Sequence, residues 1–185
     1  YIETEYADNF LASVLQVKLF EEAGQPFIHW SLEPERMNFA VSGDTAYAGF
    51  ELVLKLEDPQ GRSLFEKVDE VPLNLSLEQY KAHEPQRFAF QAILPVIPGE
   101  HRLIFLLKNK TGRDFSSNET RILVPGREQA GFSSLLLHHG RTAVPEAQKS
   151  SLKAFVINGT QFLAGTRNEF LAAEKMGVFV QLFHP

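Results

Sequence analysis

The sequence of 185 residues contains no cysteine. A disulfide-stapled scaffold, a thiol nucleophile and a cysteine metal site are therefore excluded. The absence does not define a cellular compartment, because many exported bacterial domains also lack cysteine.

The chain also lacks long apolar stretches and basic runs. No stretch is apolar for long enough to cross a bilayer, and no signal peptide is visible. The densest positive charge is in one turn, which carries only Lys108, Lys110 and Arg113. The formal net charge of the chain is −5. Proteins that bind nucleic acids usually carry a clustered basic surface. We therefore expect no membrane span in this chain and no nucleic-acid partner.

Recognisable catalytic motifs are missing as well. There is no G-x-S-x-G nucleophile elbow, no phosphate-binding glycine loop and no EF-hand calcium loop. His138 and His139 are neighbours, so in a strand they would point to opposite faces and could not easily share a metal ion. We predict that the chain is not an enzyme and holds no cofactor and no metal.

What the sequence does contain is a strong alternation of apolar and polar residues. In Thr45 to Glu57 the even positions are apolar, whereas most odd positions are polar. This is the pattern of a half-buried strand. Asp58-Pro59-Gln60-Gly61 then predicts a turn, and Ser63 to Glu70 is expected to return as a hairpin partner at the edge of the sheet.

Similar patterns predict further strands over Ser13–Phe20, Phe27–Trp30, Met37–Val41, Arg87–Leu94, Arg102–Lys108 and Asn118–Val124. Only Leu77–Ala82 and Asn168–Lys175 look helical, which is too little for a parallel α/β fold. The predicted fold is all-β, an immunoglobulin- or fibronectin-III-like antiparallel β-sandwich with a further β-rich C-terminal segment.

Pro125-Gly126 marks the predicted boundary between two parts of the chain. Residues 1–126 are expected to form the sandwich, and residues 127–185 a β-rich extension or the start of a second β-domain, in which Asn158-Gly159 predicts a hairpin turn. The apolar residues of this second part are too numerous to stay solvated, and we expect them to pack on the sandwich, on a partner chain or on another domain; they are Phe155, Ile157, Phe162, Phe170, Val178, Val180 and Phe183.

An aromatic patch is the candidate ligand site. Phe27, His29 and Trp30 lie close together in the sequence, and we group them with Tyr47. Such rings offer a stacking surface for a sugar or a peptide. The competing interpretation is that the single tryptophan belongs to the core or covers a seam between domains, which is the commoner role.

Several segments carry a resemblance to a known family. They are Leu15-Gln16-Val17, Phe50–Gly61, Ile97–Leu103, Thr120–Pro125 and Phe132–Leu137. Their order resembles the β-sandwich region of bacterial GWxTD-domain and von Willebrand factor A-related proteins of the acidobacterial type. Where that family has Pro-Gly-x-Tyr, this chain has His101 in place of the tyrosine. Neither the GWxTD motif nor a metal-dependent adhesion motif is present, so the resemblance implies architecture and export but no activity.

Three functions remain open at this point. The leading hypothesis is a non-catalytic module, a spacer or protein-interaction domain of a larger bacterial envelope or secreted protein, with a protein partner or neighbouring domains of the same polypeptide. The alternatives are a carbohydrate- or peptide-binding module that uses the Phe27–Trp30 region and an accessory domain of a hydrolase. Because the chain starts at Tyr1 without an initiator methionine, we expect it to be a fragment of a longer protein. The export that the family resemblance implies predicts an extracytoplasmic location, in the periplasm, at the cell surface or in the medium.

Overall fold

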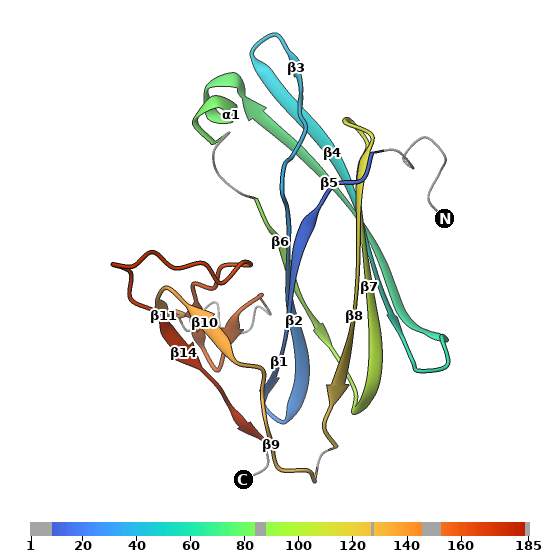
Figure 1. Ribbon diagram of the computed structural model, residues 1–185, viewed down its shortest axis with the longest axis vertical. Coiled ribbons are helices and arrows are strands. Elements are labelled where there is room, and N and C mark those ends of the chain that lie inside the picture. The colour runs from blue at the N-terminus through green and yellow to red at the C-terminus, as the bar shows by residue number, and fades with distance from the viewer. Residues whose placement is uncertain (1–8, 84–87, 127, 146–152, 184–185) are drawn as a thin grey trace. The chain divides into compact units, whose positions relative to one another are not determined.

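The computed structural model describes residues 9–83, 88–126, 128–145 and 153–183. Strands dominate this part of the chain, and its single helix is the short α1 (Leu77–His83) (Figure 1). The strand pairs whose register is defined are antiparallel. The predicted fold class, an all-β antiparallel sandwich with a further β-rich C-terminal segment, is confirmed.

The contacts between residues divide the chain into two compact units. Unit 1 comprises Tyr1–Val14, Glu33–Phe88 and Glu100–Ile122. Unit 2 comprises Leu15–Leu32, Ala89–Gly99 and Leu123–Pro185. The C-terminal part of the chain therefore shares a unit with strands from the first hundred residues.

The sheet of unit 1 is built around β4 (Thr45–Glu57). β5 (Ser63–Ser76) pairs with the full length of β4 on one edge. β3 (Ala40–Ser42) and β7 (Gly99–Asn109) pair with β4 on the other edge, and β8 (Asp114–Val124) lies next to β7.

Local sequence accounts for these elements. The even side chains of β4, from Ala46 to Leu56, are buried, as the alternation predicted. α1 begins after a capping box, in which the Gln79 amide donates to Ser76 Oγ (3.1 Å) and the Ser76 amide donates to Gln79 Oε1 (2.9 Å). The helical turn expected in this segment is thus confirmed.

Unit 2 contains a three-stranded sheet in the order β1 (Ser13–Glu22), β2 (Gln25–Pro34) and β6 (Phe90–Pro95). The rest of the unit consists of short ladders: β9 (Gly131–Phe132) with β15 (Leu182–Phe183), β10 (Leu136–His138) with β14 (Gly177–Phe179), and β13 (Thr160–Phe162) with both β11 (Arg141–Ala143) and β12 (Val156–Ile157).

The C-terminal segment packs on β1 and β2 within unit 2. Its core joins one side chain of β1 to four from the C-terminal strands and loops, namely Phe20, Leu136, Phe155, Ile157 and Phe162. The Gln181 amide also closes the edge of β1, because its Nε2 donates to Glu21 O and its Oε1 accepts from the Glu21 amide, both at 2.9 Å. Four of the apolar residues expected to pack are indeed buried, whereas Val178 and Val180 are exposed.

Two local predictions for the C-terminal segment had opposite outcomes. The Asn158-Gly159 hairpin turn is confirmed, since both residues have positive φ and they connect β12 to β13. The helix expected over Asn168–Lys175 is wrong, because Asn168 has a φ of 51° and only one turn, from Leu171 to Glu174, forms there. In the strand expected over Arg87–Leu94, Arg87 lies outside the described residues.

Candidate functional site

The expected aromatic patch needs correction. Phe27, His29 and Trp30 are all buried in β2, and Trp30 is only 3% exposed. Tyr47 lies on β4 in the other unit and is 43% exposed. A ring that is closed off on both faces offers no stacking surface, so the three residues of β2 act as core. Consecutive residues of a strand point to opposite faces, and β2 is buried on both.

His29 is the buried polar group of this core. Its Nδ1 accepts a hydrogen bond from the Phe155 amide at 2.9 Å, and its ring meets the Phe20 ring edge-on at 5.3 Å. Burial lowers the pKa of His29 to about 4. The imidazole is therefore neutral at physiological pH and fastens the Phe155 loop to β2.

The adjacent histidines point in different directions, as their spacing predicted. His138 is buried beside Phe162, with ring centroids 5.1 Å apart. His139 is exposed, stacks on Phe170 at 4.3 Å and has Nδ1 3.5 Å from Glu174 Oε2. No group of three potential ligands for a metal ion exists among the described residues.

Charged residues line a cleft of about 460 Å³ in unit 1, between the β4–β5 turn and strands β7 and β8. We call it the charged cleft; its lining residues are Asp58, Pro59, Gln60, Gly61, Glu100, His101, Arg102, Glu119 and Arg121. His101, one of the lining residues, is buried at this cleft. Sequence reasoning did not find the cleft, because its residues come from three separate segments.

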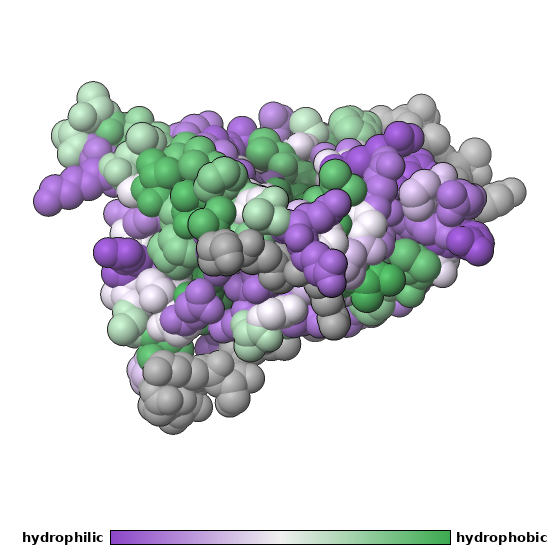
Figure 2. Space-filling view, turned by 90° about the horizontal axis from the view of Figure 1, so that it is seen from below, coloured by the Kyte–Doolittle hydropathy of each residue, from purple (hydrophilic) through white to green (hydrophobic). Residues whose placement is uncertain are grey.

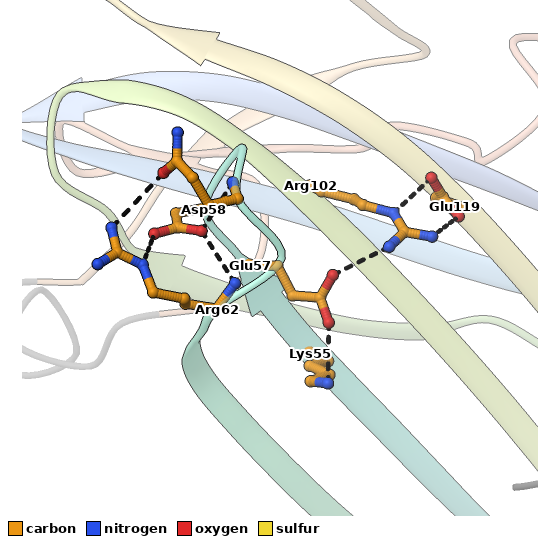
Figure 3. Close-up of polar contacts among 7 residues, drawn as sticks. Lys55, Glu57, Asp58, Arg62, Arg102 and Glu119 are labelled. Carbon is orange, nitrogen blue, oxygen red and sulfur yellow. Dashed lines mark hydrogen bonds and ion pairs between the residues drawn. The ribbon is translucent and has the colours of Figure 1, made fainter.

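Asp58 organises the turn at one side of the charged cleft (Figure 3). Its Oδ1 accepts from the amides of Gln60 and Arg62, each at 2.9 Å, while its Oδ2 accepts from Arg62 Nε at 2.6 Å. The hydrogen bond from the Arg62 amide, the largest contribution, lowers the pKa of Asp58. Gly61 then takes a φ of 78°, which suits glycine.

Arg102 joins two carboxylates on the other side (Figure 3). It donates to Glu119 through Nε (2.6 Å) and Nη2 (2.5 Å), and to Glu57 through Nη1 (3.0 Å). Lys55 Nζ lies 2.8 Å from the other oxygen of Glu57. The hydrogen bond from Lys55 lowers the pKa of Glu57, and that from Arg102 lowers the pKa of Glu119.

This arrangement determines what the charged cleft can do chemically. Glu57, Asp58 and Glu119 are ionised and already hydrogen-bonded to cations or amides. A general acid needs a carboxyl pKa raised toward neutrality, and these three are shifted the other way. The geometry is that of a stabilising ionic network.

A different kind of surface lies on unit 2. Residues 131–132 pair with residues 182–183, and residues 136–138 pair with residues 177–179. In these two ladders Leu182 lies opposite Phe132 and Val178 opposite Leu137. One face of this ribbon packs inward, and the other bears large apolar side chains that are 47–73% exposed. We call this surface the ribbon face; it consists of Phe132, Leu135, Met176, Val178, Val180 and Leu182.

Figure 2 shows hydrophobic side chains gathered on the side of the molecule where Figure 1 has β10 and β14. Neither of the two segments that carry the ribbon face contains Asp, Glu, Lys or Arg. The sequence signal for it was the surplus of apolar residues in the C-terminal part of the chain, among them Val178 and Val180.

Comparisons with known proteins do not assign the chain to a family. No protein-family model matches it, and no curated protein matches its sequence. Similar solved structures include a β-glucuronidase from Bacteroides uniformis (14% identity, TM-score 0.39) and a calcium-binding mutant of β-glucuronidase 2 from the same organism (14% identity, TM-score 0.38). In both cases the match covers 71% of this chain but only 14% of the enzyme.

A structural genomics target named SoR45 is also similar, with 6% identity and a TM-score of 0.38 over 62% of this chain and 87% of that one. Similarity at these levels implies nothing about activity. Among the described residues, no helix has the length and hydrophobicity needed to cross a membrane.

Proposed function

We propose that this chain is a non-catalytic β-sandwich module that binds a protein partner, or a neighbouring domain of its own polypeptide, through the ribbon face. The proposal includes the bacterial envelope or secreted setting implied by the family resemblance. The observation that carries it is the exposure of six large apolar side chains on one uncharged ribbon. Contiguous exposed apolar patches of this kind mark interaction sites in folded proteins.

The chemistry elsewhere in the described residues is consistent with this role. The carboxylates of the charged cleft are held ionised by their own cations and amides. Three of the four residues expected to bind a sugar, Phe27, His29 and Trp30, are buried in β2. The ribbon face is the surface whose chemistry still requires a partner, because exposed apolar area is removed from water only by contact with another apolar surface.

Site-specific photo-cross-linking in the cells that produce the full protein tests the proposal. A benzophenone amino acid at Leu135, on the ribbon face, is expected to cross-link to one defined polypeptide or to one other part of the same polypeptide. Val180→Asp should abolish that product, because a carboxylate in the contact would have to be desolvated. The matched control places the photoreactive residue at Val68, which is 53% exposed on β5 in unit 1.

Two results would contradict the proposal. One is the absence of any product from position 135. The other is a set of products that is the same from positions 135 and 68, which would indicate collisional labelling.

A further inference from the structure

Asn158-Gly159, the turn between β12 and β13, is the one place in the chain where a glycine follows an asparagine. In such a pair the main-chain nitrogen of the glycine can attack the side-chain carbonyl carbon of the asparagine, because glycine has no Cβ to hinder the approach. Asn158 is exposed, and the Gly159 amide donates no hydrogen bond to any residue that the structure describes. Both reacting groups are therefore chemically available.

The conformation of the turn holds these two groups apart. φ is 48° at Asn158 and 71° at Gly159, and the turn joins Ile157 to its partner Thr160, which is the pattern of a type I′ turn. In an ideal type I′ turn the first central residue has a ψ of about 30°. At that value the next nitrogen points away from Cβ, since the two come together only when ψ is large and negative. Attack on Asn158 Cγ therefore requires a rotation about its Cα–C bond that opens the turn.

Contacts on both sides of the turn keep it closed. Gly159 O accepts a hydrogen bond from the Val144 amide at 2.8 Å. Phe155, which precedes the hairpin, donates its amide to His29 Nδ1 and accepts from the Phe162 amide, both at 2.9 Å. The rings of Phe155 and Phe162 belong to the core of unit 2. Opening the turn thus costs free energy, and only a minor fraction of the molecules has it open at any time.

We propose that Asn158 is a site of spontaneous deamidation, at a rate set by the opening of the β12–β13 turn. In the open turn the Gly159 nitrogen bonds to Asn158 Cγ, the Cγ–Nδ2 bond breaks, and ammonia leaves with the proton of the Gly159 amide. Water then opens the resulting five-membered imide at either carbonyl carbon, which gives aspartate or isoaspartate. No oxidant, reductant or cofactor takes part. This inference goes beyond the proposed function, because it concerns a turn outside the ribbon face.

The isoaspartate product changes the local structure. Its main chain runs through the former side-chain carbonyl, so one methylene group is added within the turn. A two-residue type I′ turn has no room for a longer main chain while Ile157 stays paired with Thr160. The modified turn therefore does not close as before, and the Phe155 amide loses its fixed position next to His29. Deamidation at this single position loosens the core of unit 2 irreversibly.

Peptide mass spectrometry of the purified chain, incubated at mildly alkaline pH, is the first test. We expect Asn158 to be the first asparagine to deamidate, with isoaspartate detected by enzymic methylation. Its rate should be at least roughly tenfold higher in the urea-unfolded chain than in the folded chain, because unfolding removes the opening step. Asn74, which is exposed on β5 and followed by leucine, is the internal control and should stay unmodified over the same time. Earlier deamidation of another asparagine, or equal rates at Asn158 in the two states, overturns the proposal.

Substitutions at His29 test the role of opening in the folded chain. His29→Leu removes the acceptor of the Phe155 amide and should raise the deamidation rate of Asn158 several-fold. His29→Asn keeps an acceptor and is the matched control, with a rate near that of the unaltered chain. A second measurement uses the unaltered chain alone: low concentrations of urea should raise the deamidation rate of Asn158 and the amide hydrogen exchange rate of Thr160 in parallel. A deamidation rate that stays constant while Thr160 exchange rises overturns the proposal.

Discussion

The sheet of unit 1 and the ribbon of unit 2 both expose one face, and the two faces differ in chemistry. In unit 1 opposite charges face each other across strands: Glu51 opposes Lys108 and Glu57 opposes Arg102 in the β4–β7 register. Lys108 Nζ lies 3.0 Å from Glu51 Oε1. In unit 2 the ribbon face has apolar side chains and no ion pair within it. The comparison teaches that unit 1 pairs its charged side chains internally, whereas the ribbon face of unit 2 leaves large apolar side chains in contact with water.

The interiors of the two regions also differ. The described buried face of β4 is lined by apolar side chains from Ala46 to Leu56. Unit 2 buries a histidine among phenylalanines, where only one hydrogen bond, from the Phe155 amide, compensates Nδ1. We therefore expect the stability of unit 2 to fall as the pH is lowered from 6.5 towards 4.

The largest effect should come from the core of unit 2. Phe20→Ala removes a fully buried ring and should lower the free energy of unfolding by about 3–5 kcal/mol. Phe132→Ala, on the ribbon face of the same unit, should change it by less than about 0.5 kcal/mol. Urea unfolding followed by fluorescence of Trp30, the only tryptophan, measures both. Equal effects of the two substitutions would contradict the division of unit 2 into core and ribbon face.

The next largest effect should come from the protonation of His29 in acid. Below pH 6.5 the unfolded chain binds a proton at residue 29, whereas folded His29 binds one only near pH 4. The free energy of unfolding should therefore fall as the pH is lowered from 6.5 to 4, by about 3 kcal/mol in total. His29→Asn keeps an acceptor for the Phe155 amide but does not titrate, and should remove this dependence. The measurement is urea unfolding monitored by Trp30 at a series of pH values.

The carboxylates of unit 1 should affect stability in a lower pH range than His29. The pKa values of Glu51, Glu57 and Glu119 are lowered from 4.5 by hydrogen bonds to Lys108, Lys55 and Arg102 respectively. Their contribution to stability is present above pH 4.5 and is lost as the pH falls through the lowered values. If the free energy of unfolding of His29→Asn, followed by Trp30 fluorescence, still falls between pH 6.5 and 4.5, the acid sensitivity has a source other than His29.

The smallest effect should come from the ionic network. Arg102→Met leaves Glu57 with Lys55 alone and Glu119 without its bidentate partner. We expect the pKa of Glu57 to rise, which carboxylate NMR can measure. We also expect the stability of unit 1 to fall modestly and to depend less on salt concentration than in the unaltered chain. Lys67→Met removes an exposed pair with Asp69 and should be nearly silent. No change in the Glu57 pKa would contradict the network.

Local structure was largely predictable from the sequence. The bounds of β4, the Asn158-Gly159 turn and the capping box at Ser76 all follow from patterns within a few residues. The helix expected over Asn168–Lys175 did not form because a short apolar period is compatible with several conformations. Asn168 has a positive φ, and only the turn from Leu171 to Glu174 follows it. The charged cleft was not predictable, since Asp58, Arg102 and Glu119 meet only through strand register.

The sequence by itself determined the all-β class, the main strands and the surplus of apolar side chains after residue 126, because alternation and turn residues act over short range. Only the tertiary structure decided which apolar residues are covered. His29 became core because the C-terminal segment packs on its face of β2 in the same unit, and Trp30, on the other face of that strand, is buried as well. Val178 stayed exposed on the opposite face of the ribbon from Phe179. Burial depends on contacts between residues far apart in the chain, which no local pattern contains.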